Sequence, residues 1–323
     1  MQFTFLGRSG LSVSRLALGT NNFGSFADED ECVAMMDTAL ERGINLFDTA
    51  NMYGRREFQG YTEQIVGRWL SQDPGRRNRI VLASKVYGKM GAGENDQRLS
   101  AYHIRRACED SLRRLKTDHI DLYQMHHVDL NTPWEEIWQA MEQLVHEGKV
   151  TYFGSSNFAA WHIAQASESA ARRHKLGLVS DQSIYSLANR TVELEVLPAC
   201  MSYGIGVIPY SPLGGGLLAG MLRKADRHRS GEPGVMERLE KHRPQLERWE
   251  SFCETLGQPP EAVALAWLLI RPAVTAPIIG PRTVNQLTGC MAALEISLDK
   301  SVLAELDDIW PGPGGEAPQA YAW

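Results

Sequence analysis

The chain has 323 residues, of which 43% are hydrophobic and 22% are charged, and its formal net charge at pH 7 is -6. This composition is typical of a globular chain that can bury a large core, and it argues against an intrinsically disordered polypeptide. The acidic balance argues against a nucleic-acid-binding surface.

The first predicted element is a β-hairpin. The stretch QFTFLGRSGLSVS alternates apolar and polar residues on both sides of Gly-Arg-Ser-Gly, which is the pattern of two strands joined by a tight turn. We expect this hairpin to serve as a lid or a plug.

After the hairpin, short apolar runs alternate with longer amphipathic stretches. The short runs predict eight strands, at Leu16–Gly19, Asn45–Asp48, Ile80–Lys85, Asp121–His126, Thr151–Ser155, Leu178–Gln182, Gly206–Tyr210 and Ala276–Gly280.

The amphipathic stretches between these runs predict helices. Asp28 is the expected N-cap of a helix that ends at Gly43, and Ser100 is the expected N-cap of SAYHIRRACEDSLRRL. Further helices are predicted at Thr62–Leu70, Pro133–Glu147, Trp161–His174, Val192–Tyr203, Met236–Leu256 and Pro260–Ile270.

The order of these elements predicts the fold class. Strands alternate with helices without a compositional break that would mark a linker, which favours a single (β/α)8 barrel of the TIM type over two stacked domains. We therefore expect one barrel domain over residues 1–323, ending in a Pro- and Gly-rich tail at 311–323.

A doubly wound dinucleotide-binding fold is the alternative. Gly214-Gly-Gly216-Leu-Leu-Ala219 matches G-x-G-x-x-A after a predicted strand, but it comes late and lacks the adjacent βαβ unit that gives the motif its meaning. The barrel is favoured, and the same glycines are interpreted as a loop that binds phosphate.

The cysteines and the amino-terminal stretch bear on the compartment. The five cysteines are scattered, odd in number and without CxxC spacing, so we expect reduced thiols. MQFTFLGRSG has no basic segment followed by an apolar run, and no window approaches the ~20 apolar residues of a membrane span. A cytoplasmic location is expected.

Four polar residues stand where predicted strands end, which is where a (β/α)8 barrel places its active site. Asp48 ends the second barrel strand and Tyr53 follows it in FDTANMYG, while Lys85 ends IVLASK and His126 ends DLYQMH. Each alone has an ordinary structural explanation, such as a turn cap or a solvated strand end, but the four together favour one site.

The chemistry of these four groups is complementary. A phenol with a reference pKa near ~10 is a poor acid near neutrality unless a cation stabilises its phenolate. Lys85 would supply that cation, Asp48 would keep Lys85 charged, and His126 would hold the substrate oxygen beside Tyr53. The sequence therefore predicts a site that protonates a carbonyl while a nicotinamide cofactor supplies hydride.

A metal site is the other interpretation of this region. His126, His127 and Asp129 are metal-ligating residue types, but neighbouring residues of a strand point to opposite faces, so both imidazoles should not meet one ion. No metal site is predicted.

These residues resemble the aldo-keto reductases, which are NAD(P)H-dependent enzymes on a (β/α)8 barrel. The resemblance covers nearly the whole chain and rests on FDTANMYG, ASKV, DLYQMHHVD, GKVTYFGSSNF, YSPLGGGLLAG and PIIGPRTVNQL. It implies that Tyr53 donates the proton, that Asp48 and Lys85 tune it, and that His126 orients the substrate carbonyl.

The same resemblance implies where the cofactor binds. It assigns the nicotinamide carboxamide, the nicotinamide ring, the pyrophosphate and the adenosine end to a set of positions in chain order: Ser156, Asn157, Gln182, Tyr210, Ser211, Leu213, Gly216, Gly280, Arg282 and Gln286. Arg282 is the one obvious cation for a 2′-phosphate, so NADPH is expected and NADH is the alternative. The chain departs from the family where Thr288-Gly289-Cys290 replaces the usual E-E-N, whose asparagine meets adenine.

The pattern, including the PGPGGEAP tail, is similar to that of bacterial members that reduce aldehydes, ketones or keto-sugars. A small-molecule carbonyl substrate is therefore expected, with no nucleic-acid or membrane partner. The alternative is a cofactor-sensing barrel that regulates a partner, as potassium-channel β subunits do. The enzyme is favoured because the sequence lacks a basic or disordered amino-terminal extension to act as an interaction arm.

Overall fold

The computed structural model describes residues 1–54, 59–223 and 235–317, so Tyr321 and Trp323 of the predicted tail lie outside the described residues. Eight parallel strands lie side by side in the order β10-β3-β4-β5-β6-β7-β8-β9. The strands are β3 (Ala17–Gly19), β4 (Leu46–Asp48), β5 (Val81–Val86), β6 (Ile120–Met125), β7 (Val150–Ser156), β8 (Leu178–Gln182), β9 (Gly206–Val207) and β10 (Ile278–Ile279).

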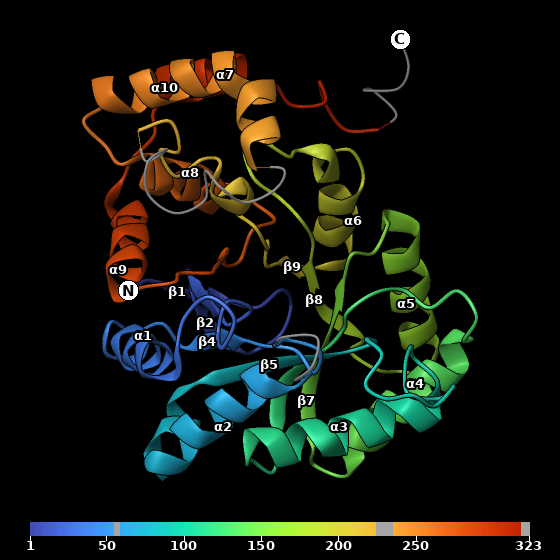
Figure 1. Cartoon of the computed structure of the whole chain (residues 1–323). Helices are drawn as coiled ribbons and strands as arrows, with labels where there is room; N and C mark the ends of the chain where they lie inside the picture. The colour runs from blue at the N-terminus through green and yellow to red at the C-terminus, as the bar shows by residue number, and fades with distance from the viewer. Residues whose placement is uncertain (55–58, 224–234, 318–323) are drawn as a thin grey trace.

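The two ends of this sheet meet and close it into a barrel. A parallel bridge joins Val207 to Val274, just before β10, and the Thr275 amide donates to Val207 O at 2.8 Å. Helices surround the strands on the outside (Figure 1). The predicted (β/α)8 barrel is confirmed, and the doubly wound alternative was wrong.

The helices follow the strands as the alternation predicted. They are α1 (Glu29–Glu41), α2 (Tyr61–Gln72), α3 (Ala101–Leu115), α4 (Trp134–His146), α5 (Ala160–Arg172), α6 (Val196–Tyr203), α7 (Val235–Thr255), α8 (Pro260–Leu269), α9 (Val284–Met291) and α10 (Lys300–Ile309), with short 3-10 turns at η1 (Pro74–Arg79), η2 (Thr191–Glu193), η3 (Gly214–Gly216) and η4 (Ala292–Glu295).

Both predicted N-caps are confirmed. Asp28 Oδ1 accepts from the Glu31 amide at 2.9 Å, and Ser100 Oγ accepts from the His103 amide at 3.2 Å. Each bond satisfies one backbone donor that the first turn of a helix cannot pair internally.

Two predicted strands are shorter in the structure because each contains a proline. Pro209 and Pro277 have no amide hydrogen to give to a ladder. The runs predicted at Gly206–Tyr210 and Ala276–Gly280 therefore pair regularly only over β9 and β10. Both prolines still accept through their carbonyl oxygens, since the Ile278 amide donates to Pro209 O at 2.8 Å and the Ala17 amide donates to Pro277 O at 3.0 Å.

The amino-terminal hairpin plugs the barrel at the end where the strands begin. Its strands β1 (Phe3–Phe5) and β2 (Ser12–Ser14) pair antiparallel, as predicted. Between them Gly7 has a φ of +54°, and a Cβ at this position would lie 2.4 Å from Val179 O, at the start of β8. Only glycine allows this approach, so the hairpin closes the end of the barrel opposite the carboxyl ends of the strands.

The core has two layers. The inner layer fills the barrel with side chains from the strands and the plug, namely Leu6, Val13, Ala17, Leu46, Val81, Ala83, Leu122, Val179, Ile208, Ala276 and Ile278. The larger outer layer packs the helices on the strands and includes fully buried indoles such as Trp69, Trp138 and Trp267. A packed interior forces any chemistry to the ends of the barrel.

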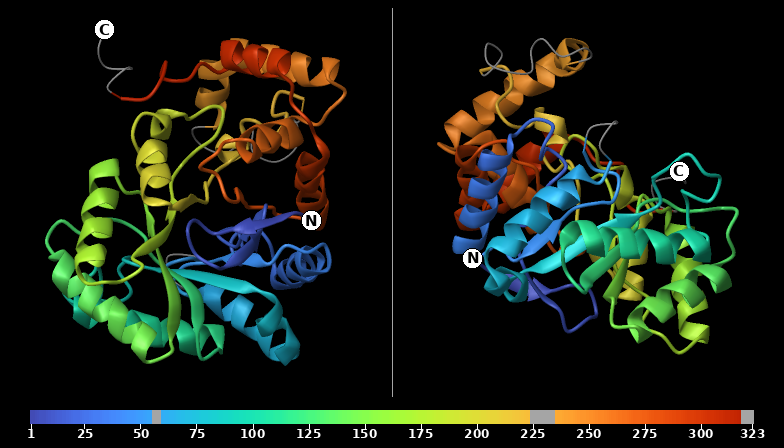
Figure 2. Two further views of the ribbon diagram at one scale, coloured as in Figure 1. Left: turned by 180° about the vertical axis from the view of Figure 1, so that it is seen from behind. Right: turned by 60° about the horizontal axis from the view of Figure 1, so that its bottom comes forward.

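The remaining elements cover the outside. Helices α7 and α10 lie alongside each other (Figure 2), where Arg248 donates to Glu305 at 3.4 Å. After α10 the described part of the tail returns to η2 and α6, and the Ala317 amide donates to Leu194 O at 2.9 Å. All five cysteines are buried free thiols. Among the described helices, none combines the length and the apolar character that crossing a membrane requires.

Candidate active site

Lys85 stands at the centre of a buried polar cluster at the carboxyl ends of β4, β5 and β6. Its Nζ donates to Asp48 Oδ2 at 2.6 Å, to Thr49 O at 2.9 Å and to Tyr53 Oη at 3.0 Å. The ammonium side chain is 0% exposed and the carboxylate 3% exposed. A fully buried lysine with three acceptors satisfies all of its donors, so this side chain is fixed.

The backbone explains why the predicted carboxylate, phenol and ammonium meet. Asp48 is the last residue of β4, and its carbonyl oxygen accepts from the Thr20 amide at the end of β3. The Asn51 amide then donates to Lys85 O at 3.3 Å, which holds the loop after β4 against the end of β5. Tyr53 lies two residues further along this loop, so its hydroxyl returns to the Lys85 side chain.

Two glutamines hold the Asp48 carboxylate from the other side. Gln124 Nε2 and Gln182 Nε2 each donate to Asp48 Oδ1 at 2.9 Å, and Gln182 Nε2 also donates to Gln124 Oε1 at 3.1 Å. Sequence reasoning missed Gln124. Gln124 lies opposite Lys85 in the register of β5 and β6, and a pairing between two strands cannot be read from positions along one strand.

Burial and charge shift the pKa of the central groups. Burial opposes the charged form of Lys85, but the Asp48 carboxylate and the Tyr53 phenol outweigh it and raise the lysine pKa above its ordinary value. Burial raises the pKa of Tyr53, and the nearby ammonium offsets part of that rise. At neutral pH the cluster therefore holds a charged lysine beside a protonated phenol.

His126 completes the set that the sequence brought together. Its ring meets the Tyr53 ring edge to face, with centroids 5.8 Å apart. Burial, then the charge of Lys85 and then His127, lower the pKa of His126 to about 2. The imidazole is therefore neutral, and its buried Nδ1 has no hydrogen-bond partner among the described residues.

The expected orientation of His127 was wrong. β6 ends at Met125, so neither His126 nor His127 belongs to the strand and the alternation of faces does not apply to them. Instead their rings stack, with centroids 5.4 Å apart and planes 12° apart. In the part of the chain that the structure describes, no three His, Cys, Asp or Glu side chains form a group that could hold a metal ion.

The residues predicted for the nicotinamide carboxamide form a hydrogen-bonded chain beside this cluster. Ser156 Oγ donates to Gln182 O at 2.7 Å, and Asn157 Nδ2 donates to Ser156 Oγ at 3.0 Å and to His126 O at 3.1 Å. Tyr210 Oη donates to Asn157 Oδ1 at 2.9 Å. A carbonyl oxygen has two lone pairs, so Asn157 Oδ1 can accept a second hydrogen bond from a carboxamide.

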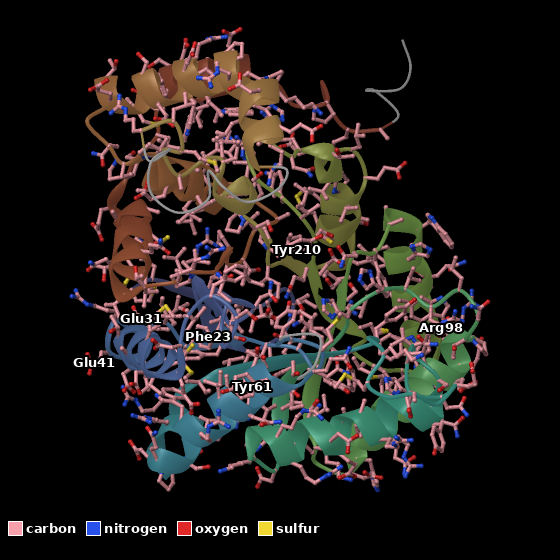
Figure 3. All side chains as sticks on the ribbon, in the orientation of Figure 1. Phe23, Glu31, Glu41, Tyr61, Arg98 and Tyr210 are labelled. Atoms are coloured by element: carbon pink, nitrogen blue, oxygen red, sulfur yellow. The ribbon has the colours of Figure 1, made fainter. Side chains whose placement is uncertain are left out.

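Backbone strain marks the same end of the barrel. Asn157 and Ser211 have φ angles of 58° and 51°, a region that few residues other than glycine adopt. Such strain is concentrated at ligand-binding sites in proteins. Tyr210 precedes Ser211 and bonds Asn157, so its side chain links the two strained positions beside β8 and β9 (Figure 3).

The predicted pyrophosphate loop is a tight 3-10 turn. Leu213 precedes η3, in which Gly215 has a φ of 67° and Gly216 a φ of 98°. Arg238 of α7 lies against this turn and donates through Nη2 to Gly214 O at 2.6 Å. Sequence reasoning missed this cation, because Arg238 belongs to an arginine-rich stretch in which no spacing distinguishes it.

The residues predicted for the adenosine end lie in the loop between β10 and α9. The Arg282 amide donates to Gln286 Oε1 at 2.8 Å, and Gly280 O accepts from Asn22 Nδ2 at 2.7 Å. The Arg282 guanidinium carbon lies 3.9 Å from the centre of the Phe26 ring. These residues are therefore apart from the Lys85 cluster, at the neighbouring β3 and β10 side of the same barrel end.

The chain is similar to known proteins along nearly all of its length. A family model described as the aldo/keto reductase family matches residues 15–311. An uncharacterized oxidoreductase, YrpG, of Bacillus subtilis is 54% identical over 100% of both chains. The versiconal hemiacetal acetate reductase of Aspergillus parasiticus is 30% identical over 95% of this chain and 96% of its own. A probable voltage-gated potassium channel β subunit of Oryza sativa is 32% identical over 92% of each chain.

Proposed function

The chain belongs to the aldo/keto reductase family of oxidoreductases, and we propose that it reduces an aldehyde, ketone or keto-sugar carbonyl to an alcohol with NADPH. One observation carries this proposal. Lys85 Nζ contacts the Asp48 carboxylate at 2.6 Å and the Tyr53 hydroxyl at 3.0 Å, so one buried cation links a fixed anion to a phenol that can act as an acid.

Tyr53 is the proton donor in this proposal. Its Oη holds a proton at neutral pH, because the ordinary pKa of a phenol is about 10 and burial raises it further. The proton moves to the substrate oxygen as negative charge develops there. The Lys85 ammonium then stabilises the phenolate left on Tyr53. Asp48, held by Gln124 and Gln182, keeps that ammonium charged throughout.

His126 orients the substrate. Its Nδ1 is buried and has no acceptor within the described residues, so the single proton of the neutral ring is better placed on Nε2. From there it can donate to the substrate carbonyl oxygen beside the phenol. The stacked His127 ring fixes the plane of the imidazole.

The residues at this end of the barrel fit a nicotinamide dinucleotide. Asn157 Oδ1 has a lone pair for a carboxamide, Tyr210 offers a flat face, and the glycine turn with Arg238 suits a pyrophosphate. When bound, the cofactor supplies the hydride. Arg282 is the proposed contact of a 2′-phosphate, through a charge-assisted hydrogen bond.

The test is the Tyr53→Phe protein, which keeps the ring and deletes the acid. We expect NADPH affinity to persist and kcat to fall by about 10²-fold or more, because the missing interaction forms only in the transition state. NADPH absorbance would be followed with a panel of aldehydes, ketones and keto-sugars. Tyr203→Phe is the matched control, since this phenol bonds Glu168 outside the site. A Tyr53→Phe protein with wild-type kcat would refute the mechanism.

A regulatory barrel is the second candidate, favoured by the 32% identity to a probable potassium channel β subunit. The same measurements separate the two. Tight NADPH binding by the wild-type protein, without turnover of any carbonyl in the panel, would favour regulation of a partner over catalysis.

A further inference from the structure

Phe26 is a large aromatic side chain that the catalytic proposal leaves without a role. It lies in the loop between β3 and α1 and is 56% exposed. Its ring is the surface on which Arg282 rests, with the guanidinium carbon 3.9 Å from the ring centre. This distance is well within the roughly 6 Å over which a cation interacts with an aromatic face.

The loop that carries Phe26 is fixed by its own backbone. The Phe26 and Ala27 amides both donate to Asn22 O, at 2.9 and 3.2 Å, and the Gly24 amide donates to Ala27 O at 3.0 Å. Asn22 Nδ2 in turn donates to Gly280 O at 2.7 Å. The Phe26 ring is thus held in place next to the loop that follows β10.

The other side of the contact is fixed as well. Thr283 caps α9 by accepting from the Gln286 amide at 3.2 Å, and Gln286 Oε1 accepts from the Arg282 amide at 2.8 Å. The backbone of Arg282 is therefore rigid, and the conformation of its long side chain depends on what the guanidinium contacts. Stacking uses the flat face of a guanidinium and directs its N–H groups outward along the edge, where a phosphate binds.

The amino terminus of α9 stabilises a bound phosphate less than helix amino termini usually do. Glu31 Oε1, from α1, accepts from the amide of Val284, the first residue of α9, at 2.8 Å. Figure 3 shows Glu31 on α1, where this helix lies next to α9. A carboxylate at that position offsets the positive end of the helix, so recognition of a 2′-phosphate depends more on Arg282.

We propose that Phe26 is a positioning residue that holds the Arg282 guanidinium ready for the 2′-phosphate of NADPH, and thereby contributes to the preference for NADPH over NADH. The inference rests on the proposed cofactor role of Arg282. Because the ring already orders a side chain with high rotamer entropy, binding orders less of it. A cation–π contact at an exposed site corresponds to a change of about 2- to 5-fold in affinity.

The experiment measures dissociation constants of NADPH and NADH by titration calorimetry, without turnover. We expect Phe26→Ala and Phe26→Leu to weaken NADPH by about 2- to 5-fold and to leave NADH unchanged, while Phe26→Tyr keeps the wild-type values. Phe5→Ala is the matched control, because Phe5 is 63% exposed on the hairpin at the opposite end of the barrel.

Arg282→Ala, alone and combined with Phe26→Ala, separates this inference from the proposed function. Arg282→Ala should weaken NADPH far more than NADH, and adding Phe26→Ala to it should change neither constant further. If Arg282→Ala weakens NADPH binding selectively and Phe26→Ala changes neither dissociation constant, the role of Phe26 is overturned and the cofactor assignment stays intact. Equal losses of both cofactors on Arg282→Ala would overturn both. A Phe26→Ala effect that persists without Arg282 would overturn only the role of Phe26.

Discussion

The Asp48→Asn protein is the most informative perturbation of the site. In the structure Asp48 Oδ2 neutralises Lys85, while Oδ1 accepts from Gln124 and Gln182. An asparagine keeps one oxygen for the two glutamine amides and turns its NH₂ group toward the ammonium. The substitution therefore removes the counter-charge of Lys85 with little change in volume.

The size of the effect depends on the burial of the pair. With side-chain exposures of 0% and 3%, breaking the pair on one side should cost about 3–5 kcal/mol of unfolding free energy. Burial, the largest influence on the lysine, would then be opposed only by Tyr53 and should lower the pKa of Lys85 below its ordinary 10.5. The unfolded chain would bind that proton more tightly than the folded variant, so the stability of the variant should rise as the pH increases toward 10.5.

Urea unfolding at about pH 7 and about pH 9.5 measures this change, since the deficit relative to the wild type should be smaller at the higher pH. The kcat for carbonyl reduction should fall by about 10²-fold or more, because Tyr53 loses a cation that stabilises its phenolate. These two effects should appear together in one protein.

Glu63→Gln is the matched control for Asp48→Asn. Glu63 is also fully buried, and it accepts from Ser84 at 2.6 Å and from Arg114 at 2.7 Å on the outer side of the barrel. Its loss should destabilise the protein equally at the two pH values of the assay, because arginine does not deprotonate, and should leave kcat unchanged. An Asp48→Asn protein with the wild-type kcat would refute the reasoning. So would a loss of unfolding free energy in Asp48→Asn that does not change with pH, as expected for Glu63→Gln.

Two further predictions concern pH. Because burial and Lys85 lower the pKa of His126 to about 2, and Tyr53 stays protonated, the kcat for reduction should be flat between about pH 5 and about pH 8; an inflection near the ordinary histidine pKa that His126→Gln abolishes would contradict this. Burial raises the pKa of Asp181 from 3.8 to about 6, against hydrogen bonds from Ser183 and Ser155, so folding takes up a proton in this range and the contribution of Asp181 to stability falls as the pH rises through it. The unfolding free energy of Asp181→Asn should therefore rise by up to ~3 kcal/mol relative to that of the wild type between about pH 4 and about pH 7. Urea unfolding that gives the same difference between the two proteins across this range would contradict the prediction.

The fold could be predicted because the barrel repeats one local pattern. Hydrophobic periodicity and helix caps such as Asp28 and Ser100 are short-range signals, and each is visible in a few residues. The ends of strands were less predictable. Pro209 and Pro277 lie inside runs that look like strands, but a ladder depends on the amides of both neighbours, and the neighbours are set by closure of the barrel.

The candidate site also has a part that the sequence predicts and a part that it does not. Asp48, Tyr53, Lys85 and His126 could be placed together because the carboxyl ends of parallel strands converge, so position along the chain was enough. Contacts between side chains of distant elements carried no such signal.

The pairing of Arg282 with Phe26 shows why. Nothing in PIIGPRTVNQL or NNFGSFADED indicates that the two segments touch, and the contact exists because β10, late in the chain, pairs in parallel with β3, the first strand of the barrel. The hydrogen bond from Asn22 to Gly280 then brings an exposed ring under a guanidinium. Residues that position a cofactor-binding group from a strand far away in the chain are therefore fixed by the order of strands in the barrel, and they emerge only from the three-dimensional structure.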